Sequence, residues 1–182
     1  MKKTLLSIAV VLGSLVGVNA QNGTSVGGEV MSPKKNIVEN AINSKDHTTL
    51  VAALKAADLV ATLQSEGPFT VFAPTNDAFD NLPAGTVGTL LKPENKGLLT
   101  TILTYHVVAG EYTADKLIKE IKFYGGKRTL KTVSGGTLIA KLNGKNIMLT
   151  DENGAVANIT IIDVMQSNGV LHVIDAVVTP KS

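Results

Sequence analysis

The hydrophobic pattern of the chain changes near its middle. From Asn36 to about Leu117, apolar residues recur at spacings of three and four, which is typical of amphipathic helices. From Arg128 onward, apolar and polar residues alternate over short runs, which is typical of half-buried strands. Helices early in the chain and strands late in it predict an α+β fold, with a sheet formed largely by the C-terminal half.

The first half predicts several short helices. Their apolar positions fall at residues 37–42, 50–63 and 98–103, and a further helix is expected to begin at Thr113 or Asp115. Thr48 or Thr49 is placed to cap the helix that carries the 50–63 stripe, because a threonine side chain can accept a hydrogen bond from the first turn. Tyr105 is expected to be strand-like.

The second half predicts five strands, at residues 128–133, 137–144, 145–150, 155–165 and 169–179. Asn-Gly pairs stand at 143–144, 153–154 and 168–169, and both residues of such a pair tolerate the positive φ angles of tight turns. Strands this close in sequence predict an antiparallel meander.

Residues 67–79, GPFTVFAPTNDAF, connect a strand to a helix. Phe69 and Val71 lie on one face of the expected strand and Phe72 on the other, so both faces are apolar and the strand is predicted to be central. Pro74 is expected to end its ladder, because proline cannot donate a backbone hydrogen bond. Thr75 is expected to cap a short helix.

The N-terminus predicts export. Two lysines, an apolar run from Leu5 to Val18 and small residues before position 21 form a secretory signal peptide over residues 1–20, cleaved between Ala20 and Gln21. The chain has no cysteine to carry a lipid anchor, and no later segment is apolar for long enough to span a membrane. We therefore expect a secreted or periplasmic protein, with a flexible leader at 21–33 and one domain at 34–180.

Charge excludes one class of partner and suggests another. The chain has 17 Lys+Arg and 15 Asp+Glu, but two of the lysines lie in the signal peptide, so the remainder is balanced and predicts no nucleic-acid binding. Residues 116–145 carry eight basic residues, among them Lys127, Arg128 and Lys131, and one acid, Glu120. This segment is interpreted either as a solvated face or as a patch for an anionic surface polymer, with Lys127 and Arg128 on an exposed loop.

Catalytic and metal-binding patterns do not stand out. The three histidines, His47, His106 and His172, are far apart in the sequence, and no cysteine accompanies them, so no metal site or cofactor is predicted. No nucleophile or phosphate-loop motif occurs, and we predict no enzyme activity. Residues 151–154, DENG, favour a hairpin turn over a calcium loop. His172 is interpreted as a core residue and Asp175 as a paired or edge carboxylate, whereas His106 is open between a structural role and ligand contact.

Three motifs resemble the signatures of the fasciclin-domain family. Residues 67–79 resemble its first signature motif, Tyr105-His106 within TYHVVAG its Tyr-His motif, and residues 168–180, NGVLHVIDAVVTP, its second. The resemblance covers residues 36–180. It implies strands in a β-sandwich or wedge with helices packed beside it, and a single-domain, secreted, bacterial-type extracellular module associated with adhesion.

The resemblance also implies partner-binding positions. In animal members, the Tyr-His pair and an Asp-Ile pair before the second motif are linked to integrin binding; here they are Tyr105-His106 and Asp163-Val164. Together these observations predict a monomeric, non-enzymatic module that binds a surface or matrix protein or an anionic glycan. A periplasmic carrier of a small apolar ligand is the second hypothesis, and an unrecognised enzyme the third.

Overall fold

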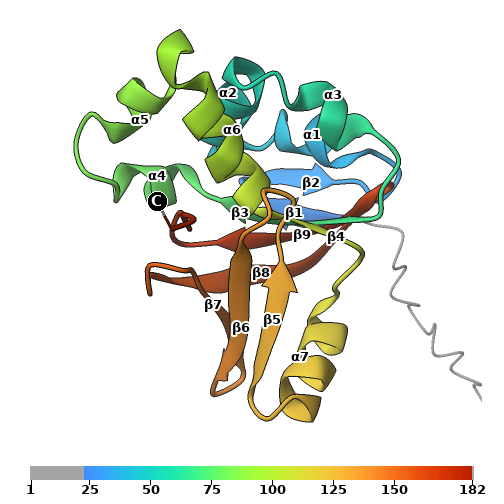
Figure 1. The fold of residues 1–182 in the computed structure, drawn as a ribbon. Coiled ribbons are helices and arrows are strands. Elements are labelled where there is room, and N and C mark those ends of the chain that lie inside the picture. Colours follow the sequence, from blue (N-terminus) through green and yellow to red (C-terminus); the bar gives the residue numbers. More distant parts are fainter. Residues whose placement is uncertain (1–22, 182) are drawn as a thin grey trace, which may run out of the picture.

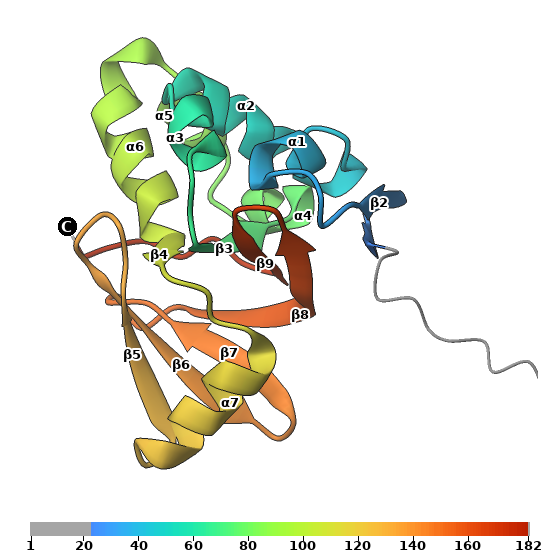
Figure 2. The ribbon, with the colours of Figure 1, turned by 90° about the vertical axis from the view of Figure 1, so that its right-hand side faces the viewer.

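A computed structural model describes residues 23–181, and the predicted signal peptide with its cleavage site at Ala20–Gln21 lies outside the described residues. Six helices form a layer over one face of two neighbouring strands, β3 (Phe69–Pro74) and β9 (Gly169–Ile174) (Figures 1 and 2). The other strands of the main sheet curve away on the opposite side, and the seventh helix packs beside them. The mixed α+β architecture predicted from the change of period is confirmed.

The helices are short, and two small 3₁₀ turns lie between them at residues 45–47 and 93–95. They are α1 (Ile37–Ala41), α2 (Thr48–Ala56), α3 (Val60–Gln64), α4 (Asn76–Asp80), α5 (Thr86–Leu90), α6 (Lys96–Tyr105) and α7 (Ala114–Phe123). Tyr105 therefore ends a helix and is not strand-like, because the apolar stripe of α6 continues through it into the core.

The apolar stripe over residues 50–63 is divided between α2 and α3, which corrects the prediction of one continuous helix. Asp58 adopts a left-handed conformation with φ +54°, and this ends the helical path after Ala56. Neither Thr48 nor Thr49 caps α2 with its own side chain. Instead, Oδ1 of Asn76 accepts a hydrogen bond from the Thr49 amide at 3.0 Å, so the cap comes from α4.

The main sheet has seven strands in the order β4-β3-β9-β8-β7-β6-β5. Their bounds are β3 (Phe69–Pro74), β4 (Val107–Ala109), β5 (Lys127–Lys131), β6 (Thr137–Asn143), β7 (Asn146–Thr150), β8 (Val156–Gln166) and β9 (Gly169–Ile174). The last five form the predicted antiparallel meander, and only β3 and β9 pair in parallel within this sheet. The two edge strands approach each other through a bridge between Val108 and Thr132, so the sheet is almost closed.

Strand β3 lies inside the sheet, paired with β4 on one side and β9 on the other, and both of its faces are covered, as its two apolar faces predict. Val71 and Ala73 belong to a core shared with helices α1–α6, whereas Phe72 belongs to a second core shared with α7 and strands β5–β8. Thr75 caps α4 by accepting a hydrogen bond from the Ala78 amide at 3.2 Å, which confirms the strand–turn–helix prediction. Strand β3 thus lies between two hydrophobic cores and contributes side chains to both.

The sequence predicts a flexible leader at residues 21–33, but the structure has a small hairpin within this segment. Strands β1 (Thr24–Val26) and β2 (Glu29–Met31) pair across Gly27 and Gly28, both of which have positive φ. Val26 and Met31 are buried in the core of the helices, so apolar burial fixes this segment to the fold.

The two lobes differ in charge. The helical lobe, residues 37–106, contains α1–α6 with β3 and carries four lysines and seven acids, a net charge of −3. The basic lobe, residues 113–162, contains α7, β5–β7 and the first part of β8 and carries eight basic and four acidic residues, a net charge of +4. The charge asymmetry of the sequence is therefore an asymmetry in space, because the lobes occupy opposite ends of the molecule (Figure 2).

Candidate functional site

The Tyr-His pair lies inside the protein, at the junction between the lobes. The Tyr105 ring is fully buried, and its hydroxyl donates a hydrogen bond to the Thr137 carbonyl at 2.5 Å and accepts one from the Glu152 amide at 3.2 Å. Burial raises the pKa of Tyr105 to about 12. Gly136 lies directly against this ring, because a Cβ at that position would stand 2.7 Å from Cε2 of Tyr105. Tyr105 therefore joins α6 to the start of β6 and to the turn that follows β7.

His106 follows Tyr105 and is 3% exposed. Its Nδ1 lies 2.8 Å from the Ile102 carbonyl and its Nε2 accepts a hydrogen bond from the Val178 amide at 3.2 Å. These two partners require a proton on Nδ1 and none on Nε2, so the imidazole is neutral. Burial lowers the pKa of His106 to about 4. Both ring nitrogens are used to connect α6 with the C-terminal segment.

Asp163 and Val164 lie in an irregular part of β8. The register of β8 against β9 shifts before Val164, and Asp163 has a φ of +54° at this bulge. Oδ1 of Asp163 accepts a hydrogen bond from the Ala114 amide at 2.7 Å, which stabilises the start of α7. Val164 is fully buried.

His172 shares the surroundings of Asp163. Its Nδ1 accepts a hydrogen bond from the Asp163 amide at 3.2 Å, and its Nε2 lies 2.8 Å from the Tyr112 carbonyl, so its proton is on the opposite nitrogen from that of His106. Burial lowers the pKa of His172, and its ring stacks on Phe72 at 5.7 Å. The prediction of a core histidine with hydrogen-bond partners is confirmed.

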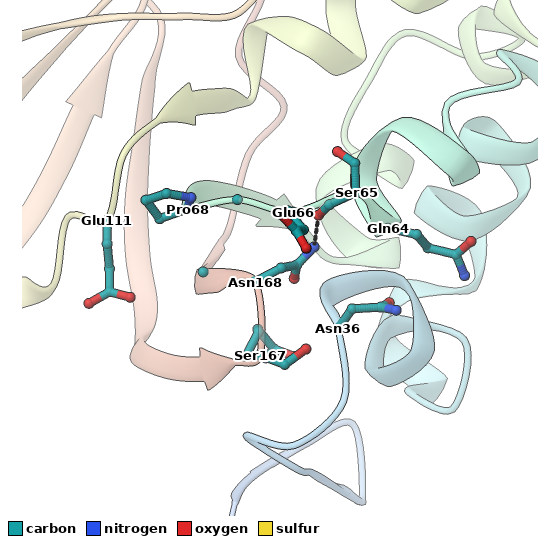
Figure 3. Close-up of a pocket in the computed structure, with 11 residues that line it drawn as sticks. Asn36, Gln64, Ser65, Glu66, Pro68, Glu111, Ser167 and Asn168 are labelled. Carbon is teal, nitrogen blue, oxygen red and sulfur yellow. Dashed lines mark hydrogen bonds between the residues drawn. The ribbon is translucent and has the colours of Figure 1, made fainter.

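An open polar groove of about 570 Å³ lies where β3 and β9 begin (Figure 3). Four separate segments contribute its lining: residue 36, residues 64–68, residue 111 and residues 166–169. Asn168 holds these segments together, since its side chain accepts from the Ile37 amide and donates to the Leu63 and Ser65 carbonyls. The groove contains the carboxylates of Glu66 and Glu111 and no basic lining residue.

Three lysines share the outer face of β5 and β6. Lys127 stands directly opposite Lys141 in the strand register, and Lys131 is on the same side of β5 because strand side chains alternate. Within residues 23–181, none of these lysines has a carboxylate oxygen within 4 Å. Like charges directly opposite each other destabilise a sheet, so this face favours an anionic neighbour.

Arg128 differs from the lysines beside it. Its Nε lies 2.6 Å from Oε2 of Glu120, and its guanidinium stands 5.0 Å from the ring centre of Tyr124. Lys127 and Arg128 thus begin strand β5 and point to opposite faces, which corrects their expected position together on a loop. The strand starts immediately after Gly126 because the alternating pattern starts there.

The Fasciclin domain family matches residues 45–180, three quarters of the chain. This chain belongs to the fasciclin-domain family.

Relatives of this fasciclin domain come from several bacteria. Protein sll1483 of Synechocystis is 49% identical over 148 residues, covering 79% of this chain and 73% of that protein. Immunogenic protein MPB70 of Mycobacterium bovis is 34% identical over 183 residues, covering 93% and 84%. A fasciclin-domain pair from the insect cell adhesion molecule Fasciclin I has the same fold, with a TM-score of 0.73 at 19% identity over 81% of this chain and 52% of that structure. A pair of domains with this fold thus occurs in an insect cell adhesion molecule.

The sequence-predicted site residues of this fasciclin domain are not brought together. Tyr105 and His106 lie at the end of α6, Asp163 and Val164 in β8, and the lysines on the opposite side of the meander. Asp175 was predicted to be a paired or edge carboxylate, and it is exposed and accepts hydrogen bonds from the amide and side chain of Asn158. Residues 151–154 form the predicted turn, with Oδ1 of Asp151 accepting from the amides of Asn153 and Ala155.

Two features were missed at the sequence level. The groove depends on Asn168, which the pattern indicated only as a turn residue. The exposed aromatic pair Phe123-Tyr124 was overlooked, although two aromatic residues before Gly-Gly at the end of an amphipathic helix are an available signal. Across residues 23–181, no group of three or more His, Asp or Glu side chains could hold a metal ion.

Proposed function

We propose that this fasciclin domain is an exported, non-enzymatic adhesion module that binds an anionic glycan of the cell surface or matrix through the outer face of β5 and β6. The observation that carries the proposal is the pairing of Lys127 with Lys141, with Lys131 on the same face and no carboxylate partner in the described chain. Several cations on a flat surface meet a polyanion together, so the weak individual contacts add.

The motif residues support a structural role by their hydrogen bonds. Tyr105 and His106 are buried, and every polar atom of their side chains has a backbone partner. A partner that contacted either side chain would have to open the junction between α6 and the meander. We therefore assign recognition to the lysine face rather than to the Tyr-His pair or to Asp163-Val164.

The hypothesis of a carrier for a small apolar ligand has less support than the glycan proposal, because the apolar hollows of the interior are small. Among the described residues, the two apolar hollows that lie between the helices and the sheet have volumes of about 20 and 10 Å³. Pockets for drug-sized ligands usually measure about 300–1,000 Å³. The larger groove is open and polar, and the amide side chains of Asn36, Gln166 and Asn168 are hydrogen-bonded within the fold.

The test is retention on immobilised alginate, a polyuronate. Reversing Lys127→Glu and Lys141→Glu together keeps two like charges opposite each other, so the cross-strand repulsion is unchanged while the sign of the face changes. We expect apparent affinity to fall on the order of tenfold or more, and retention of the wild type to weaken with salt.

The matched control reverses two exposed lysines of the helical lobe, Lys55→Glu and Lys92→Glu. This variant has the same net charge as the first and should be retained better than it. An equal loss of alginate retention in both variants would mean that retention depends on the net charge of the protein and not on this face. Full retention of the Lys127/Lys141 variant would overturn the proposal. The lysines would then serve only to keep the edge strand β5 from pairing with a strand of another molecule.

A further inference from the structure

The end of α7 carries an exposed aromatic pair. Phe123 is 81% exposed, more than any other large apolar residue in the described chain, and Tyr124 is 54% exposed. Their rings meet edge to face with centres 5.0 Å apart. Residues 122–127, KFYGGK, are all exposed, and we call this segment the aromatic tip. The chain has only seven aromatic residues, four Phe and three Tyr, so two adjacent exposed rings need an explanation.

The aromatic tip has a fixed shape. The Gly126 amide donates to the Ile121 carbonyl at 2.8 Å and the Gly125 amide donates to the Lys122 carbonyl at 3.4 Å. These two bonds form a Schellman motif, which needs positive φ after the helix, and Gly125 has φ +74°. Below it, Leu117 and Ile121 anchor α7 in the second core. The rings are therefore presented by a rigid helix end.

Charge around the aromatic tip has one sign. Lys119, Lys122 and Lys127 are exposed, and the one nearby acid in the sequence, Glu120, is paired with Arg128. In both views, the turn from α7 to β5 lies at the end of the molecule remote from the helical lobe (Figures 1 and 2). The helical lobe, with its net negative charge, is thus turned away from any surface that the aromatic tip approaches.

We propose that the aromatic tip docks on an anionic lipid surface. A bilayer interface offers an apolar layer that accepts a protruding Phe and a plane of anionic headgroups that accepts the lysines around it. A polysaccharide supplies the charge without a continuous apolar layer for the Phe123 ring, which is 81% exposed. Tyr124 has the apolar ring and polar end that suit the headgroup level. The site goes beyond the glycan face, from which it differs by the aromatic pair and by Lys119 and Lys122.

The test places a fluorescent reporter at the tip. The chain contains no Trp, so Phe123→Trp introduces a single one there, and Leu98→Trp introduces one at an exposed site of the helical lobe as a control. With vesicles of phosphatidylcholine and phosphatidylglycerol, we expect a blue shift and quenching by brominated acyl chains at position 123 and not at position 98. The reporter is local, so binding through another part of the chain does not imitate this result.

Two further variants separate the apolar and charged contributions. Phe123→Ser should weaken vesicle binding about tenfold by removing the inserted ring. Lys119→Gln with Lys122→Gln should weaken it about tenfold, compared with Lys55→Gln and Lys92→Gln as control. Both tip variants should keep their retention on alginate, so failure of this proposal is distinguishable from failure of the glycan face.

The proposal is overturned if position 123 shows no shift with anionic vesicles, or the same shift with phosphatidylcholine alone. A shift at position 123 on adding alginate, together with loss of alginate retention in Phe123→Ser, would instead assign the tip to the glycan site.

Discussion

The helical lobe and the basic lobe are built on opposite faces of the same two central strands, yet their surfaces differ. The helical lobe has a net charge of −3, and its core contains much of the first signature motif, whereas Tyr105 packs into the second core. The basic lobe has a net charge of +4 and presents the exposed Lys127 and Lys131 and an exposed aromatic pair. The residues that identify the family lie mainly between the lobes, whereas the residues that we propose to contact partners lie on the outside of one lobe.

This difference separates what defines the family from what defines this member. In this chain the buried motif residues fix strand pairing and helix ends, on which the fold depends. Surface side chains on a meander can change without disturbing the core, so they are suited to set the partner of an individual protein. Substitutions in the core, at the junction between the lobes and at the helix ends test this difference between the lobes.

The largest expected effect is truncation of the shared core. Phe72→Ala removes a fully buried ring on the side of the basic lobe and should lower the free energy of unfolding by about 3–5 kcal/mol. Val71→Ala removes a smaller side chain on the side of the helical lobe and should have a smaller effect. In urea melts followed by circular dichroism, both variants should unfold in one transition, because β3 belongs to both cores. Separate transitions for the two lobes would contradict a shared core.

The next effect is a loss of stability in acid. The folded pKa of His106 is about 4 and its unfolded value is about 6.5, so the unfolded chain binds the extra proton between these values. The contribution of the neutral His106 to the free energy of unfolding is fully present above about pH 6.5. It falls by about 3 kcal/mol as the pH drops to about 4. His172, whose pKa is also lowered, adds to the loss. Urea melts across this range should show a shallower pH dependence in His106→Gln; an identical slope would argue against a buried neutral His106.

A smaller effect is expected at the junction of the lobes. Gly136→Ala places a Cβ about 2.7 Å from the Tyr105 ring and should cost about 1–3 kcal/mol through overpacking. Gly97→Ala in α6 is the matched control, because that position has open space and should gain up to about 1 kcal/mol. Equal thermal stability of the two variants would show that Tyr105 packs differently from the structure.

The smallest effect compares helix caps across the lobes. Thr75→Ala should cost about 1 kcal/mol, because its hydroxyl is the side-chain cap of α4. Thr113→Ala should cost less, since its bond to the Lys116 amide is 3.4 Å long and Asp163 also caps the start of α7. Chemical denaturation that ranked these two variants in the reverse order would remove Asp163 from this role.

The sequence predicts local features of this fold well and distant ones poorly. The strands, the central position of β3 and the Thr75 cap follow from period and turn chemistry within a few residues. The break at Asp58 and the cap supplied by Asn76 do not, because both depend on the packing of α2 against other helices.

The site was less predictable than the fold. A charge excess over residues 116–145 indicated a basic patch, but the separation of Lys127 from Arg128 required knowing where β5 begins. The roles of Tyr105 and His106 required their partners Thr137 and Val178, which lie 32 and 72 residues away in sequence. Single-residue patterns contain no information on such contacts.

The central claim is that partners meet the outer face of the basic lobe and not the buried family motif. An amide NMR titration with an alginate oligosaccharide tests it most directly. Shift changes should concentrate in residues 127–131 and 139–143, with little change at Tyr105 and His106. Changes centred on Tyr105, His106 and the neighbouring Val178, with β5 and β6 unaffected, would contradict the account.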